Sequence, residues 1–273
     1  SEAPGRVVAV GDVHGDLAAL KVALRAADII DESGSWSGGN AVLVQTGDIL
    51  DRGDDELEIY QFFDQLIAAS EKAGGRVILM HGNHELMNAA GDFRYVTAGG
   101  WQDWQSEPVP ARLRAALADV DDDKRGRVAA WAPGGSWAMR VADQPVIAVV
   151  GRTAFAHGGV LPVHLGKVDE MHRQVQCWLR GAGPAPQSVL GDPSSPVWTR
   201  IYAEPVPPCD VVGQVVGQLG VDRLVVGHTV QLDGVQSRCG GALWLIDVGM
   251  AKHYGGKPAA LVIDGKQVGS TSR

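Results

Sequence analysis

The sequence predicts an α/β fold, and three observations support this interpretation. Apolar runs of four or five residues, bounded by glycine, alternate with helical patterns through the first third of the chain. The hydrophobicity of these runs is continuous, which is typical of parallel strands covered on both faces. The chain has 273 residues, of which 45% are hydrophobic and 21% charged, so it can bury a large core. We therefore expect parallel strands joined by right-handed helical crossovers.

The first third follows a β-α-β-α-β order. Strands are expected at residues 6–10, 41–45 and 76–80, each a short apolar run. Helices are expected at residues 17–27 and 56–72, where apolar side chains recur at helical spacing.

The alternation of strand and helix patterns stops between residues 91 and 143. This stretch holds Trp101, Trp104 and Trp131, a helical pattern at residues 111–118 and an acidic run at residues 119–123. We expect a mostly helical insertion beside or over an active site. The acidic run is expected to be a solvated loop, because it lacks the ordered spacing and terminal glutamate of a calcium loop.

The remaining elements predict a second sheet. The short, closely spaced strands near the end favour antiparallel character. The sequence predicts strands at residues 144–150, 153–156, 223–226, 235–238, 242–246 and 259–263. It also predicts helices at residues 165–179 and 210–219, with a long surface loop at 181–196. We treat residues 1–273 as a single domain.

Charge and composition exclude several classes of partner. The net charge of −8 argues against non-specific binding to nucleic acid or to an anionic membrane. No apolar run is long enough to span a bilayer. The first residue is Ser1 rather than Met, so we expect a processed or trimmed start; cytoplasm, organelle and periplasm all stay open.

The three cysteines, Cys177, Cys209 and Cys239, form no Cys-x-x-Cys pair. Such an odd and sparse set does not resemble a disulfide framework or a zinc knuckle. We expect free thiols packed as small apolar groups. One disulfide stays possible, and the sequence cannot place it.

Polar cassettes follow the predicted strands. The three longest are Gly11-Asp12-Val13-His14-Gly15-Asp16, Gly47-Asp48-Ile49-Leu50-Asp51-Arg52-Gly53 and Gly82-Asn83-His84-Glu85, and single histidines follow two later strands. Strands that end in this way deliver side chains to the carboxyl edge of a sheet, where open α/β folds keep their active sites. The candidate metal ligands are Asp12, His14, Asp48, Asn83, His157 and His228.

This donor set favours a two-metal centre. Mixed carboxylate, amide and imidazole ligands suit Mn, Fe or Zn better than Ca. Six candidates are too many for one tetrahedral ion, but they fit two ions that share a bridging carboxylate. Two metals about 3.5–4 Å apart are a common device for phosphoester hydrolysis, in which they lower the pKa of a bridging water and neutralise the phosphoryl oxygens.

Other cassette residues suit other roles. The guanidinium of Arg52 matches two phosphate oxygens. His84 follows a candidate ligand, so its side chain should project toward a leaving group, and Asp51 could orient it and favour its protonated form. Each residue alone has a simpler structural explanation, but chance coincidence of all three cassettes in order is remote. His81 could face the site or be packed or exposed; His164, His172 and His253 are expected to be structural.

From Val7 to about Gly249, the chain resembles the phosphoprotein phosphatase family of metallophosphoesterases. Within this family, it is most similar to the Shewanella-like branch. The branch is indicated by the segments Gly82-Asn83-His84-Glu85-Leu86-Met87-Asn88, Pro196-Val197-Trp198-Thr199-Arg200 and Ile246-Asp247-Val248-Gly249-Met250. The resemblance implies an α/β/β/α sandwich of two mixed β-sheets flanked by helices.

The resemblance also implies roles for individual residues. It implies that Asp12 and His14 bind one metal, that Asp48 bridges, and that Asn83, His157 and His228 bind the other. It implies phosphate binding by Arg52, Arg200 and Asn83, and His84 as a proton donor held by Asp51. Met80-His81 replaces the Leu-Arg that precedes this cassette in the eukaryotic Ser/Thr enzymes, and their C-terminal toxin-contact motif is absent. Their docking grooves and toxin sensitivity are therefore not carried over.

The expected function is that of a metal-dependent protein phosphatase. It would hydrolyse phosphomonoesters by attack of a hydroxide that bridges two metal ions. The expected partner is a phosphorylated protein or peptide, with phosphotyrosine slightly favoured over phosphoserine and phosphothreonine by resemblance, and a monomer is favoured. Two alternatives stay open at this point: a dinucleoside polyphosphate hydrolase and an inactive scaffold with the same fold.

Overall fold

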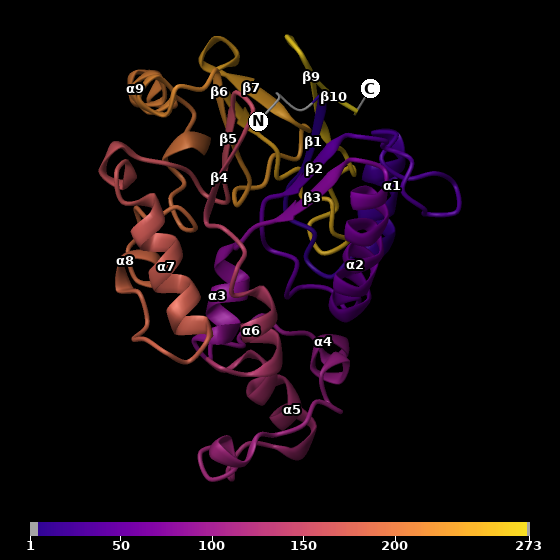
Figure 1. The fold of residues 1–273 in the computed structure, drawn as a ribbon, viewed down its shortest axis with the longest axis vertical. Helices are drawn as coiled ribbons and strands as arrows, with labels where there is room; N and C mark the ends of the chain where they lie inside the picture. Colours follow the sequence, from indigo (N-terminus) through magenta and orange to yellow (C-terminus); the bar gives the residue numbers. More distant parts are fainter. Residues whose placement is uncertain (1–4, 272–273) are drawn as a thin grey trace.

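The computed structural model describes residues 5–271 and contains two five-stranded sheets with helices outside them (Figure 1). The start of the chain, which we expected to be processed, lies outside the described residues. The strand order is β10-β9-β1-β2-β3 in one sheet and β4-β5-β6-β8-β7 in the other. Both sheets mix parallel and antiparallel pairs. The expected sandwich of two mixed sheets is confirmed.

The first sheet is built on the predicted parallel strands β1 (Arg6–Val10), β2 (Val42–Gln45) and β3 (Arg76–Leu79). The crossovers contain α1 (Leu17–Ala26) and α2 (Glu56–Lys72). The strand predicted at residues 259–263 was expected in the second sheet, and this was wrong. It forms β9 (Leu261–Asp264), which pairs antiparallel with β1, and an unpredicted strand β10 (Gln267–Ser270) follows it.

The second sheet is less antiparallel than we expected. Its inner strands β5 (Thr153–Ala156), β6 (Arg223–Val226) and β8 (Leu243–Leu245) are parallel. Only the edge strands β4 (Ile147–Val150) and β7 (Gln236–Arg238) pair antiparallel. The physical reason is the long connection between β5 and β6, which carries α7 (Val168–Leu179), α8 (Gln187–Leu190) and α9 (Cys209–Leu219), because parallel pairing requires such a crossover.

The two sheets share one buried interface. Val7 and Ala9 of β1 and Val44 of β2 pack in one cluster with Phe155 and Val225 of the second sheet. The alternate residues of β1, among them Val8 and Val10, belong instead to the larger core that includes α1 and α2. Each central strand is therefore covered on both faces, as its continuous hydrophobicity predicts.

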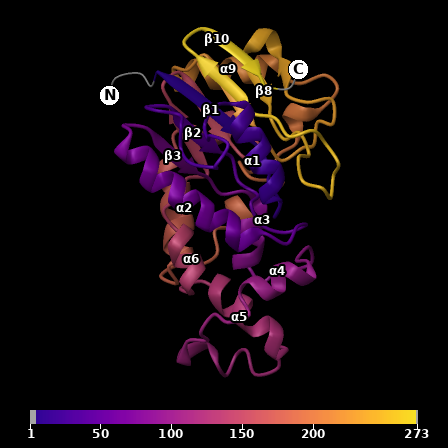
Figure 2. The same cartoon turned by 90° about the vertical axis from the view of Figure 1, so that its right-hand side faces the viewer.

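The insertion is helical, but one of its helices was predicted in the wrong place. The helices α4 (Ala98–Asp103), α5 (Asp122–Trp131) and α6 (Ser136–Val141) lie toward one end of the molecule, and α3 (Asn83–Ala89), which precedes the insertion, lies nearer the sheets (Figures 1 and 2). The helix expected at residues 111–118 is only a 3-10 turn, Ala111–Leu113. Leu117 is the one buried residue of that segment, so a helix there would have no apolar face to bury.

The loops also differ from expectation in detail. Asp122 and Asp123 of the acidic run begin α5, where their charges favour the helix N-terminus. The surface loop expected at residues 181–196 contains the short helix α8. The remaining 3-10 turns are Pro162–His164, Ile201–Ala203 and Cys239–Gly241.

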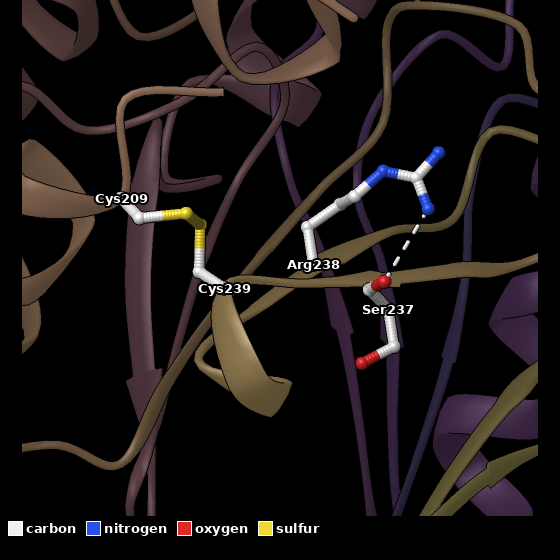
Figure 3. Close-up of a disulfide and its surroundings, with 4 residues drawn as sticks. All are labelled: Cys209, Ser237, Arg238 and Cys239. Atoms are coloured by element: carbon white, nitrogen blue, oxygen red, sulfur yellow. Dashed lines mark hydrogen bonds between the residues drawn. A yellow bond between two sulfur atoms is a disulfide. The ribbon is translucent and has the colours of Figure 1, made fainter. Parts of the chain in front are cut away.

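The expectation of three free thiols was wrong for two of the cysteines. Cys209 and Cys239 form a disulfide with a Cα–Cα distance of 5.3 Å, which ties the start of α9 to the turn after β7 (Figure 3). Cys177 is free and half-buried. Pairing across 30 positions depends on how α9 packs, which cysteine spacing does not reveal. Within residues 5–271, every helix is too short or too polar to cross a membrane.

Candidate metal centre

The carboxyl ends of parallel strands from both sheets deliver the predicted ligands to one place. Asp12 follows β1, Asp48 follows β2, and Asn83 begins α3 just after β3. His157 directly follows β5, and His228 comes two residues after β6. All six predicted ligands are buried.

Asp48 lies between two groups of donor atoms. Its Oδ2 is 3.7 Å from His14 Nε2 and 3.2 Å from His157 Nε2. One group of converging donors joins His14, Asp48 and His84, and the other joins Asp48, His157 and His228. Asp12 Oδ2 lies 3.9 Å from His14 Nε2, on the side of the first group. Asp48 is therefore shared by two candidate cation positions.

The outer ring nitrogens of three histidines are held by backbone carbonyls. His14 Nδ1 donates to Leu50 O at 2.8 Å, His157 Nδ1 to Thr46 O at 3.0 Å, and His228 Nε2 to Trp198 O at 3.1 Å. Such a bond fixes the ring and leaves the other nitrogen free to coordinate, as in metal-bound histidines generally. The inner nitrogens then point toward Asp48.

The inner atoms are suited to a cation. Burial lowers the pKa of His14 to about 4, and burial together with His157 lowers that of His228 to about 2, so the inner nitrogens of both carry lone pairs. His157 Nε2 lies 2.9 Å from Asn83 Oδ1 and 3.1 Å from His228 Nδ1. A single proton on His157 cannot satisfy these acceptors and Asp48 at once, whereas a divalent cation can.

Carboxylates add negative charge to the same place. Asp247, two residues after the end of β8, is buried near Asp12. Burial and the charges of Asp247 and Asp48 raise the pKa of Asp12 well above its ordinary value, and burial raises that of Asp247 to about 6. Crowded carboxylates of this kind are stabilised by bound cations.

His84 differs from the other histidines because a carboxylate holds it. Its Nδ1 lies 2.5 Å from Asp51 Oδ2, and its Nε2 points to the centre, 3.8 Å from Asp48 Oδ2. Burial would lower the pKa of His84, but the charges of Asp48 and Asp51 outweigh it and raise the pKa above the ordinary value. The protonated form of the ring is therefore favoured, and Nε2 faces the centre.

Arg52 is positioned by the insertion. Its guanidinium stacks 3.8 Å from the centroid of the Tyr95 ring, and its backbone N–H donates to Tyr95 O. The Tyr95 ring also lies against His84. Within residues 5–271, Arg52 Nε has no hydrogen-bond partner, and the side chain lines a hollow of about 370 Å³ together with His14. The guanidinium is thus held in place but keeps donors available for an anion.

Arg200 lies on the other side of the centre. Its Nη1 donates to His228 O at 2.8 Å and to Thr229 Oγ1 at 3.0 Å. With Trp198 it lines a second hollow of about 400 Å³, so the two predicted phosphate-binding arginines flank the histidines from different hollows.

Strained backbone is concentrated at this site. Among residues 5–271, seven non-glycine residues have a positive φ. Five of these belong to the cassettes: His14, Asp48, Asp51, Arg52 and His228. Left-handed conformations cost energy for residues with a Cβ, and they persist where the surrounding structure fixes a functional geometry.

Sequence reasoning missed residues that support the ligands. Glu85 accepts hydrogen bonds from the backbone N–H groups of Gly82, Asp48, Ile49 and Leu50, which locks two cassettes together. The place of Glu85 in a cassette, and the place of Asp247 after a strand, were signals from which both residues could have been predicted.

His81, whose place the sequence left open, is fully buried and packed, and neither ring nitrogen has a partner among the described residues. His164 and His172 accept backbone hydrogen bonds.

Comparison with known proteins places this geometry in a family. The sequence model of the calcineurin-like phosphoesterases matches residues 5–232. The chain belongs to the calcineurin-like phosphoesterase family. It is 36% identical to Shewanella-like protein phosphatase 2 of Arabidopsis thaliana, over 92% of this chain and 73% of the relative. It is 29% identical to Shewanella-like protein phosphatase 1 of Plasmodium berghei, over 90% and 67%.

A solved structure agrees with this phosphoesterase fold. The cold-active protein-tyrosine phosphatase of a psychrophilic Shewanella species superposes with a TM-score of 0.75 at 24% identity, covering 97% of this chain and 77% of that one. The predicted resemblance to Shewanella-like phosphatases is therefore confirmed at the level of sequence and fold.

Proposed function

We propose that this phosphoesterase is a metal-dependent protein phosphatase that hydrolyses phosphomonoesters. One observation carries the proposal: Asp48 is shared by two clusters of buried donors, in which His14 and His228 turn lone pairs inward. The names of its sequence relatives support protein phosphatase activity. They favour it over a dinucleoside polyphosphate hydrolase and over an inactive scaffold.

The six predicted ligands divide into two sets around Asp48. In the proposed assignment, Asp12 and His14 would hold one divalent cation, Asn83, His157 and His228 would hold a second, and Asp48 would be shared between them. When bound, such a pair supplies an acidified water as nucleophile and neutralises charge on the phosphoryl group. Mn, Fe and Zn all suit this mixture of oxygen and nitrogen ligands.

Other residues of the chain bind the phosphate and move the proton. Arg52 would clamp phosphate oxygens with the donors that Tyr95 leaves available, assisted by the amide of Asn83 and by Arg200. His84 would donate the proton at Nε2 to the departing oxygen, while Asp51 holds Nδ1. Residues 91–143 belong to the same proposed catalytic domain, because Tyr95 reaches the site from this insertion.

Phosphotyrosine is the favoured substrate in this proposal. Support comes from the structural neighbour, which is named a protein-tyrosine phosphatase. The test is a panel of phosphotyrosine, phosphoserine and phosphothreonine peptides assayed with Mn²⁺ and with chelator. Faster turnover of phosphoserine or phosphothreonine peptides would contradict the preference for phosphotyrosine.

Asp48→Asn should abolish turnover of p-nitrophenyl phosphate, because one neutral amide replaces the charge shared by both cation positions. Removing a central catalytic group costs several orders of magnitude, so we expect a fall of about 10³-fold or more. Bound metal, measured on the same folded sample, should also fall. Asp119→Asn, at an exposed position of the insertion, is the matched control. Full activity of folded Asp48→Asn protein would refute the proposal.

A further inference from the structure

The guanidinium of Arg127 is fully buried behind the site. Arg127 lies in α5 of the insertion, and its side chain is 0% exposed. Nη1 donates to Glu56 Oε2 and to Gly100 O, and Nη2 donates to Glu56 Oε1. Nη2 also lies 3.5 Å from Asp51 Oδ1. A buried arginine is retained at a high desolvation cost, so its partners indicate what it does.

Arg127 fixes the orientation of the Asn88 amide. Both Nε and Nη2 donate to Asn88 Oδ1, at 3.0 Å and 2.9 Å. The amide nitrogen must then face the other way, where it lies 3.2 Å from Asp51 Oδ1 and 3.0 Å from His84 O. Because an arginine can only donate, the reversed amide would bring two donors together. Arg127 therefore selects the orientation in which Asn88 donates to the carboxylate that holds His84.

The positive charge of Arg127 offsets the negative charges of Asp51 and Glu56. Asp51 and Glu56 are both fully buried, and the backbone N–H of Asp51 donates to Glu56. Burial raises the pKa of Glu56, and Arg127 acts against that rise. Without the guanidinium, the buried carboxylates of Asp51 and Glu56 would lack the cation that contacts both of them. Arg127 thus allows Asp51 to remain a hydrogen-bond acceptor for His84.

We infer that Arg127 is a positioning residue that acts through Asn88 and Asp51 on His84. This inference rests on the proposed function, in which His84 protonates the leaving group. It assigns the insertion a part in the reaction: α5 supplies the group that keeps the His84 ring aimed at the centre. The insertion is then more than a cover over the site.

The inference predicts a dependence on the leaving group. Phenolate from phenyl phosphate is a poor leaving group and needs the proton from His84, whereas 2,4-dinitrophenolate leaves without one. General acid catalysis contributes about 10²–10⁴-fold, so partial misplacement of His84 should lower kcat for phenyl phosphate by about 10- to 100-fold. The kcat for 2,4-dinitrophenyl phosphate should change by less than about 3-fold, since that step does not use the proton.

The test variant removes the buried charge pair together. Arg127→Met alone would leave Glu56 without a partner and could unfold the protein, so it is combined with Glu56→Gln, which still accepts from the Asp51 N–H. Asp119→Asn, at an exposed position of the insertion, is the control. The double variant should bind as much metal as the wild type, and its kcat should fall only with phenyl phosphate. Equal losses with both substrates, or none with either, would overturn the inference.

A second measurement does not depend on turnover. In Zn²⁺-loaded protein, the hydrogen bond between His84 Nδ1 and Asp51 should give a far-downfield proton signal in NMR spectra, identified by its absence in His84→Gln. We expect the signal to move or broaden in the double variant but not in Asp119→Asn. An unchanged signal would overturn the positioning role. If the wild type hydrolysed neither ester, the proposed function would fail, while this signal would still decide the role of Arg127.

Discussion

Single residues at the site are held by partners that lie far away in the sequence. Asn88 and Arg127 are 39 positions apart, and Asp51 and Arg127 are 76 apart, yet all belong to one buried network. Tyr95 stacks on Arg52 in the same way. The cassettes could be predicted because each lies directly after a strand, but these partners could not. Their contacts depend on how the insertion folds back onto α2 and α3.

Asp103 should make stability depend on pH. Burial raises its pKa from 3.8 to about 7, so the folded state disfavours the ionised form. The sign follows from linkage: the penalty is absent below pH 3.8, and it grows as the pH rises toward 7. Asp103→Asn removes the charge but keeps an acceptor for the Leu57 N–H.

The Tm of Asp103→Asn should therefore exceed that of the wild type by more at pH 8 than at pH 5. Thermal unfolding at both pH values measures this difference, with Asp119→Asn as the control. A difference that shrinks with rising pH would contradict the assignment of a raised pKa.

The strand-end cassettes act as interlocked elements. A Cβ on Gly82 would lie 2.1 Å from Asp48 Oδ1, and a Cβ on Gly47, which has a φ of +99°, would lie 2.2 Å from Gly82 N. Glu85 then bonds to both cassettes. The geometry of Asp48 is therefore set by the loop after β3 as much as by its own strand.

Gly82→Ala should lower both stability and metal content, because the new methyl group must displace Asp48. Overpacking of this kind costs about 1–3 kcal/mol. Gly217→Ala is the matched control: it lies in α9 with open space around it, and alanine there should stabilise the helix by about 0.5–1 kcal/mol. Equal Tm and metal content in Gly82→Ala and the wild type would argue against interlocking.

Helices and strands were predicted correctly where the hydrophobic pattern of the segment alone was sufficient. The helix at residues 56–72 matches α2 at both ends, because its apolar face meets the sheet as its periodicity requires. Residues 111–118 have good helix formers but nothing to pack against, so propensity alone was misleading. The sheet to which β9 belongs is decided by its tertiary pairing with β1, and no local pattern in residues 261–264 indicates this pairing.

At the scale of the whole molecule, the disulfide between Cys209 and Cys239 joins a helix and a turn that flank the second sheet (Figure 3). A disulfide that closes a loop over 30 positions contributes about 3–4 kcal/mol to stability by restricting the unfolded chain.

We expect the double variant Cys209→Ala/Cys239→Ala to lose about 3–4 kcal/mol of its free energy of unfolding, measured by urea unfolding. Phosphatase activity under native conditions should persist, because neither cysteine lies among the ligands. Cys177→Ala is the control, and unchanged stability of the double variant would contradict the prediction.

The pairing of β1 with β9 has a consequence for protein synthesis. β1 ends at residue 10, but the strand that covers one of its edges ends at residue 264. A nascent chain on the ribosome therefore exposes that edge of β1 until β9 has been synthesised. An open edge recruits other strands. Chaperones that shield extended apolar segments would cover this strand until the hairpin of β9 and β10 pairs with it.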